Sequence, residues 1–187
     1  MGCAATLVGM AWPGASDDRG PRARPPGGPE ATTGAASAGD VVLPLTKARV
    51  AAILEGLDYP LIRDRNDDLG AMWAQAIFHI YLLGPDESVL QVRGSWHRRL
   101  ALERLGEVLM LVDHWNLEFV GPKCYVRVLD DGRLSVVAEV STPLGAGVSD
   151  NQLTVLLQRG IGQGMRMMRD LEVRYPDPAA QPPTDLS

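Results

Sequence analysis

The most constraining feature of the sequence is the run KCYVRVLDDGRLSVVAEV, residues 123–140, in which two alternating stretches flank a short polar segment. The apolar residues recur at every second position: Cys124, Val126 and Val128, then Leu134, Val136, Ala138 and Val140. A period of two places successive side chains on opposite faces of a strand, and Asp-Gly favours a tight turn. The run therefore predicts an antiparallel hairpin with one face on a hydrophobic core.

A second hairpin is predicted upstream, over residues 71–83 and 89–96, with the turn in GPDES. A short strand, LIRDR, precedes it. Alternation places the following side chains on the buried face: Ala74, Ala76, Phe78, Ile80 and Leu82, then Leu90, Val92 and Trp96. Both hairpins therefore belong to a half-buried antiparallel sheet.

Three segments show the spacing of amphipathic helices instead. The first, LTKARVAAILEGLDY, begins at the capping residue Thr46 and ends before Pro60. The second covers residues 100–119, with a predicted buried stripe of Leu105, Val108, Leu109, Val112, Trp115 and Phe119. The third follows Ser149 or Asp150 and carries Leu153, Leu157, Ile161, Met165 and Met168. The order α-β-β-β-α-β-β-α predicts an α+β fold of two layers, an antiparallel sheet of about five strands covered by three helices.

The chain is predicted to hold one folded domain, residues 41–175. Residues 1–40 are rich in Gly, Ala, Pro and Ser, and residues 176–187 are similar, so both ends are expected to be disordered. A membrane association is not expected, because no apolar run is long enough to span a bilayer. Cys3 and Cys124 lie far apart, one of them in the N-terminal segment, so we expect no disulfide and a reducing cytoplasm.

A basic cluster in LQVRGSWHRRL, residues 90–100, is the main candidate for recognition. Arg93, Arg98 and Arg99 accompany Trp96 in a chain whose formal net charge is −5. Arginine can grip carboxylates or stack on aromatic rings, which indicates a surface for a protein partner. The alternative is that these arginines only balance Glu103 and Glu107 on the following helix. The acidic balance makes nucleic acid an unlikely partner.

Glycines inside the last predicted helix indicate a close contact. Gly160 and Gly164 stand one turn apart, where glycine costs about 1 kcal/mol relative to alanine. Another backbone must therefore approach this side of the helix, either the chain's own sheet or a symmetry mate. Met165 and Met168 lie on the same stretch and offer adaptable apolar surface for core packing or a dimer contact.

No catalytic or metal-binding constellation is expected. His79, His97 and His114 are isolated in the sequence, without ligand spacing or a cysteine pair. Ser95 does not stand in a nucleophile elbow, and the paired aspartates at 67–68 and 130–131 are explained by turns. We therefore predict a protein that is not an enzyme and needs neither metal nor cofactor.

Four separated signatures give the chain a recognisable pattern: LQVRGSWHRRL, DHWN, PKCYVRVLDDGRLSVVAEVS and the glycine-bearing RGIGQGM. In this order, over about residues 45–175, they resemble the YbjN family of bacterial proteins. The resemblance implies a fold like that of type III secretion chaperones, a regulatory role in the cytoplasm and no established catalytic residues. It also adds Asn116, next to Trp115, to the candidate binding residues, with the alternative that Asn116 caps the helix end or bonds the Pro-Lys segment that follows.

Two functions remain open at this point. The first is a protein-binding module, chaperone-like or regulatory, that holds a partner segment along an exposed sheet edge and forms a homodimer. The second is a small-molecule sensor in signal transduction or transcription, which predicts an enclosed cavity.

Overall fold

The structure is a computed structural model that describes residues 41–64 and 67–176. The disorder expected for residues 1–40 and 176–187 lies outside the described residues, except at Pro176. The elements in chain order are α1 (Lys47–Gly56), β1 (Leu61–Arg63), β2 (Leu69–Met72), β3 (Ala76–Leu83), β4 (Val89–Trp96), the 3-10 turn η2 (Leu102–Arg104), α2 (Leu105–Glu118), β5 (Lys123–Val128), β6 (Leu134–Pro143) and α3 (Asp150–Arg174).

The strands form one antiparallel sheet in the order β1-β2-β3-β4-β6-β5, which confirms the α+β class. The sheet has six strands where about five were predicted, because the single strand expected over residues 71–83 is two strands. The backbones of Trp73 and Ala76 bond each other in both directions and turn the chain back at Ala74. The two-residue turn shifts the alternation by one position, so that the inward residues are Leu69 and Ala71 before it and Ala76 and Phe78 after it. The apolar Ala74 continues the later alternation back into the turn, which hides the shift in the sequence. Ala74, expected on the buried face, is exposed.

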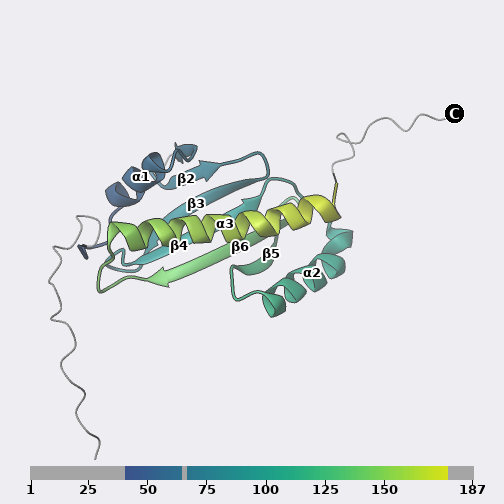
Figure 1. Ribbon diagram of the computed structural model, residues 1–187. Helices are drawn as coiled ribbons and strands as arrows, with labels where there is room; N and C mark the ends of the chain where they lie inside the picture. The colour runs from purple at the N-terminus through teal and green to yellow at the C-terminus, as the bar shows by residue number, and fades with distance from the viewer. Residues whose placement is uncertain (1–40, 65–66, 177–187) are drawn as a thin grey trace, which may run out of the picture. The chain divides into compact units, whose positions relative to one another are not determined.

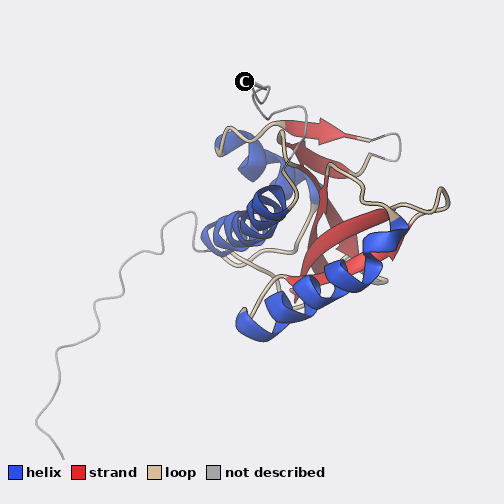
Figure 2. Cartoon of the chain, turned by 90° about the vertical axis from the view of Figure 1, so that its right-hand side faces the viewer, coloured by secondary structure: helices blue, strands red, loops and turns tan. Residues whose placement is uncertain are grey.

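The helices cover one face of this sheet. Figures 1 and 2 show α1 and α3 on the same side of the strands, with α3 crossing the middle and α2 beside β5. The core between the layers is formed by apolar side chains from every element, among them Val50, Leu54, Phe78, Ile80, Val92, Trp96, Trp115, Leu153, Leu157, Met167 and Met168. The opposite face carries no helix of the described chain, and we call it the helix-free face.

The glycines of α3 face this chain's own sheet. A methyl group at Gly160 would lie 3.0 Å from Cβ of Val92, and one at Gly164 would lie 2.6 Å from Cε1 of Phe78. The ring of Phe78 is also fixed from the other side, since a methyl group at Gly94 would lie 2.5 Å from it. The missing side chains thus bring α3 close enough to cover β3 and β4. This contact accounts for both helix glycines within a single copy of the chain.

Two methionines of α3 differ in their surroundings. Met168 is fully buried in the core, whereas Met165 is half-buried and packs against its border. At the start of the helix, the Ser149 side chain accepts from the backbone of Gln152 and the Gln152 side chain accepts in return. This capping box selects Ser149 from the two predicted caps.

The second helix differs from its prediction at both ends and on one side. Leu100 is not helical but pairs with Leu134, donating at 3.1 Å and accepting at 2.8 Å, so that α2 begins only at Leu105. Leu109, expected in the buried stripe, is exposed. The reason is that α2 lies at the border of the sheet, where Val108, Val112 and Trp115 are buried while Leu105 and Leu111 only pack against the edge of the core. The apolar stripe of α2 is therefore wider than the surface with which the helix packs on the sheet.

Candidate functional site

The basic cluster of the sequence contains a junction that joins β4 to the end of α3. The Trp96 indole donates from Nε1 to Glu172 at 2.6 Å, and Arg98 lies over its ring, 5.0 Å from the centroid. Arg98 also donates to Glu172 at 3.3 Å and to the carbonyls of Tyr175 and Pro176 at 2.5 and 3.2 Å. A cation at this place satisfies the last carbonyls of a helix. The junction therefore fixes the C-terminal end of α3.

Arg99 has its own intramolecular partners. Its guanidinium donates to the backbone carbonyls of Trp96 at 2.6 Å and Arg98 at 3.2 Å. The alternative that these arginines balance Glu103 and Glu107 does not describe them, since Arg98 pairs with Glu172 and it is Arg104 that pairs with Glu107. A role for Arg98 and Arg99 in partner binding remains a prediction, in competition with these contacts.

Arg93 lies apart from the junction, on the helix-free face. It donates from Nε to Glu139 at 2.8 Å and lies over the Tyr81 ring at 5.3 Å. Glu139 also accepts from the Tyr125 hydroxyl at 2.9 Å and from the Gln91 amide at 3.0 Å. Burial, together with the bond to Glu139, raises the pKa of Tyr125 above its usual value, so the phenol stays protonated as a donor. This network ties β3, β4, β6 and β5 together.

Asn116 connects α2 to the edge of the sheet. Its side-chain amide donates to the carbonyl of Cys124 at 2.9 Å, and its oxygen accepts from the backbone N–H of the same residue at 2.9 Å. The side chain thus occupies the position that a neighbouring strand would take at the start of β5. The predicted contact of Asn116 with a partner remains a prediction, and the structure shows its contact with β5.

The pairing at Cys124 shows in which direction the backbone N–H and C=O groups of the rest of β5 point. In an antiparallel pair, the residues that bond their partner alternate with those that do not. Cys124 directs its N–H and C=O outward to Asn116, so Val126 and Val128 direct theirs outward as well. In the described part of the chain no side chain or loop bonds these outward groups. From Val126 onward β5 is therefore an open sheet edge.

The thiol of Cys124 does not form a reactive site. Its sulfur is buried beside the carbonyl of Pro122, at 3.7 Å. Burial raises the pKa of the Cys124 thiol to about 12, so at neutral pH almost none of it is thiolate. Since the thiolate is the nucleophile, this cysteine is a core residue of β5.

The described residues place the predicted histidines in separate surroundings. His79 stacks on the ring of Tyr81, with the centroids 5.8 Å apart, and Nδ1 of His97 lies 2.8 Å from the carbonyl of Gln75. Among residues 41–64 and 67–176 no three His, Cys, Asp or Glu side chains are grouped as a metal site would need. No helix in the same ranges has the length and apolarity required to cross a bilayer.

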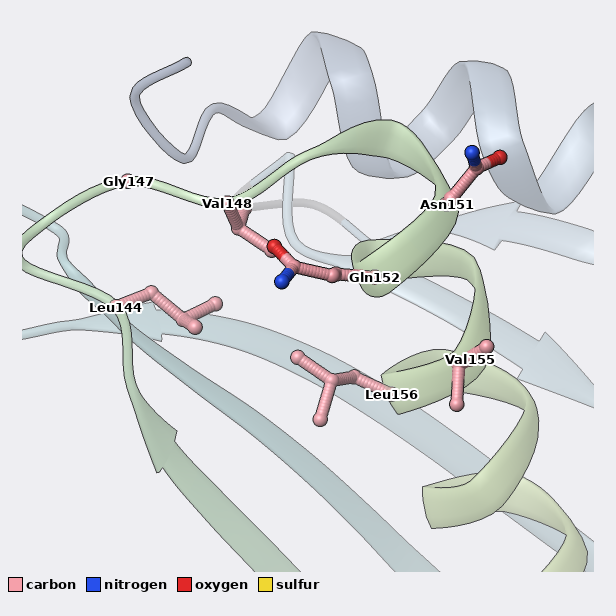
Figure 3. Close-up of a pocket in the computed structure, with 7 residues that line it drawn as sticks. All are labelled: Leu144, Gly147, Val148, Asn151, Gln152, Val155 and Leu156. Carbon is pink, nitrogen blue, oxygen red and sulfur yellow. The ribbon is translucent and has the colours of Figure 1, made fainter. Parts of the chain in front are cut away.

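An apolar hollow lies at the N-terminal end of α3, and the sequence interpretation missed it. It has a volume of about 540 Å³ and opens to the surface. Figure 3 shows the side chains of Leu144, just after β6, and Leu156 of α3 pointing toward each other, with Val155 next to Leu156 on the helix. The sequence indicates this hollow only through Val155, an apolar residue that lies outside the buried stripe of α3. A second, more polar hollow adjoins it and includes Val42, Leu43 and Asp86.

Together these features define a small α+β domain with an open sheet edge, an apolar hollow and a helix-free face. The chain belongs to the YbjN family, described as "Putative bacterial sensory transduction regulator", whose family model matches residues 46–172. No curated protein matches the sequence.

Comparison with solved structures gives matches of different quality. The crystal structure of YbjN from E. coli, described as a putative transcription regulator, has a TM-score of 0.63 at 12% identity and covers 72% of this chain and 96% of that one. The HopA1–SchA chaperone–effector complex has a TM-score of 0.44 at 16% identity, covering 66% and 90%. The ExoT–SpcS complex from Pseudomonas aeruginosa has a TM-score of 0.38 at 14% identity, covering 64% and 93%. The match to the E. coli protein shows a common fold.

Proposed function

We propose that this protein is a non-enzymatic binding module that holds an extended segment of a protein partner along β5. The observation that carries the proposal is the open edge at Val126 and Val128, whose backbone groups point away from β6. An edge strand with free N–H and C=O groups accepts another strand through main-chain hydrogen bonds. The regulatory description of the family agrees with a protein that acts by binding.

Apolar side chains border this edge and supply the specificity that main-chain bonds lack. Leu109 stands two helical turns before Asn116 on the same side of α2, and Asn116 contacts the edge directly. Val128 is exposed at the end of the strand, and so is Leu109. Alternate side chains of an added strand would meet these two residues. The expected partner segment is therefore extended, with apolar residues at every second position.

Replacing Val126 by proline is expected to reduce capture of the partner about tenfold, which corresponds to about 1.4 kcal/mol of binding free energy. Proline removes the outward N–H of Val126 and places its ring where the new strand would lie, without removing a bond to β6. The measurement is affinity purification from the native host with quantification of each co-purifying protein.

Val126→Ala is the matched control, because it shortens the same side chain and retains the N–H. A partner retained by Val126→Ala and depleted by Val126→Pro supports edge binding. Equal capture of every protein by the two variants contradicts it, provided that both have the circular dichroism spectrum of the natural chain.

A homodimer is the second part of the proposal. Met110 and Leu117 are 69% and 84% exposed and stand two turns apart on the outer side of α2. Apolar residues at this spacing form a stripe that a second copy could cover across a twofold axis. Sedimentation velocity should show a dimer for the natural chain and a monomer for Met110→Asp combined with Leu117→Asp. Val173→Asp, at an 84% exposed position on α3, is the control and should leave the dimer intact.

The alternative function, sensing of a small molecule, is less well supported. It predicts an enclosed cavity, whereas the two hollows at the N-terminal end of α3 open to the surface. A thermal-shift screen in which one metabolite raises the melting temperature would favour this alternative. We also infer a cytoplasmic location, which the buried, unpaired Cys124 supports.

A further inference from the structure

The edge of β5 carries two cations on the side of the sheet opposite the helices. We propose, in a step that rests on the proposed strand addition, that Lys123 and Arg127 select a partner segment in which acidic residues alternate with apolar ones. Alternation along β5 places Cys124 and Val126 toward the core, so Lys123, Tyr125 and Arg127 point to the helix-free face. The partner segment is therefore specified on both of its faces.

The two cations have no carboxylate partner within the domain. Both side chains are exposed, and within residues 41–64 and 67–176 neither of them makes an ion pair. The register of the sheet places Glu139 beside Lys123, but the Glu139 carboxylate already accepts hydrogen bonds from three other side chains. Arg127 lies beside Ser135, which carries no charge. The edge thus presents two positive charges that a partner can compensate.

The pairing pattern places a partner side chain close to Arg127. In an antiparallel addition, Val126 and Val128 form the hydrogen-bonded pairs with the new strand, so Arg127 stands in a pair without hydrogen bonds. Such pairs bring the two Cα atoms to about 4.5 Å, where opposite charges attract across the strands.

The next partner residue on the helix-free face lies beside Tyr125, diagonally from both Lys123 and Arg127. Asn116 already occupies the adjoining position of the edge, so the added strand extends no further in this direction. The motif that the edge recognises is therefore short. Read from its N-terminus, opposite Val128, it is apolar, acidic, apolar, acidic.

The same charges disfavour a second copy of β5 at this edge. The strand, KCYVRV, contains two cations and no carboxylate, so two such strands side by side place positive charges against each other. Cations on edge strands also serve to prevent unwanted pairing. If Lys123 and Arg127 only block pairing, their removal increases the binding of every added strand. If they recognise a partner, their removal weakens the binding of acidic strands.

Two synthetic peptides test the selection on the full-length protein. In the first peptide valine alternates with glutamate between terminal serines, and in the second lysine replaces each glutamate. Titration of isotope-labelled protein, followed through the amide signals of Val126, Arg127 and Val128, measures both dissociation constants. The glutamate peptide should bind about tenfold more tightly, because attractive charge pairs replace repulsive ones at two positions. About 1 M NaCl should remove most of this preference, since it screens exposed charges.

Variants of the edge assign the preference to its cations. Arg127→Ala should weaken binding of the glutamate peptide about threefold, and Arg127→Glu should cancel the preference between the two peptides. Arg169→Glu is the matched control: this exposed arginine of α3 has no ion pair or ring contact in the described chain, so the preference should stay unchanged. Tighter binding of the glutamate peptide to Arg127→Ala would show that the cation only blocks the edge, and would overturn the proposal.

A third peptide, with the same valines and glutamates in two separate blocks, tests the alternation. It should bind about tenfold more weakly than the alternating peptide, because its acidic and apolar side chains no longer fall on opposite faces of a strand. Equal binding of the two would mean that only the total charge is recognised, and would also overturn the proposal.

Val126→Pro separates this inference from strand addition itself. Equal affinity for the glutamate and lysine peptides, lost in Val126→Pro, would leave strand addition intact and overturn the selection of acidic residues. No shift of the Arg127 and Val128 amides with either peptide would overturn both. A preference for glutamate that survives Val126→Pro would place the acidic site away from the edge. Displacement of the glutamate peptide by single-stranded polyuridylate, at an equal concentration of negative charge, would assign the cations to a phosphate backbone and overturn a peptide partner.

Discussion

Replacing Gly164 by alanine is expected to lower the free energy of unfolding by about 1–2 kcal/mol, although alanine is the better helix former. The new methyl group would lie 2.6 Å from Cε1 of Phe78, a fully buried ring. The ring cannot move away, because Gly94 supports it from the sheet at a similarly short distance. Overpacking therefore exceeds the gain in helix propensity. Urea unfolding followed by circular dichroism measures the difference through the midpoint, at an unchanged m-value.

Gly162 provides the control within the same helix. A methyl group there meets nothing within 4 Å, so Gly162→Ala should raise the free energy of unfolding by about 0.5–1 kcal/mol. Gly162→Ala and Gly164→Ala would then change the free energy of unfolding in opposite directions. This would show that packing on the sheet, and not helix propensity, decides the effect of alanine at Gly164. A second test combines Gly164→Ala with Phe78→Leu, where a smaller cost than in the natural background shows that the two residues are coupled. Stabilisation by Gly164→Ala alone would contradict the packing of α3.

The second large effect is expected at Arg49, where Arg49→Ala should lower the free energy of unfolding by about 2–4 kcal/mol. The guanidinium donates to Asp150 at 2.6 and 3.0 Å and to the carbonyls of Leu43, Pro44 and Val148 at 2.9, 2.7 and 2.8 Å. Its side chain is only 16% exposed. One residue of α1 thus holds the entering chain and the N-terminal end of α3, and its removal leaves several acceptors unpaired.

Arg49→Lys should recover little of this loss, because an ammonium group has three N–H donors at one nitrogen, whereas the guanidinium of Arg49 makes five bonds to four separate acceptor atoms from three nitrogens. Arg63→Ala is the matched control: Arg63 pairs with Asp67 at 2.9 Å on the exposed surface, so its removal should cost less than about 0.5 kcal/mol. Unfolding of the three variants in guanidinium chloride measures the loss of unfolding free energy in each. A loss at Arg49 no larger than that at Arg63 would show that the bonds to the entering chain contribute nothing.

Much of the fold was predictable because it depends on local periodicity. The alternation at Cys124 and Val126 predicted a strand, and the spacing of Leu153 and Leu157 predicted a helix with a buried side, as observed. Thr46 was recognised as a cap by its residue type and accepts from the backbone of Arg49. These features depend on residues within a few positions of one another.

The candidate binding residues were less predictable. Arg93 and Arg98 stand five residues apart in the sequence, but the first lies on the helix-free face and the second at the end of α3. Their partners, Glu139 and Glu172, lie 46 and 74 residues away, so no local pattern indicates them. The second, more polar hollow depends in the same way on segments that are distant in sequence, residues 42–45, 86–88 and 144–147, whereas the apolar hollow is lined by residues 144–156 alone.

The sequence by itself therefore determined which segments are strands and helices, which side of each is apolar, and the family to which the chain belongs. Only the tertiary structure decided that a turn follows Met72, that the arginines bond within the chain and that β5 has an open edge. The physical reason is that side-chain periodicity is a local property, read from neighbours along the chain. Side-chain partners and sheet edges exist only once residues distant in sequence have packed together.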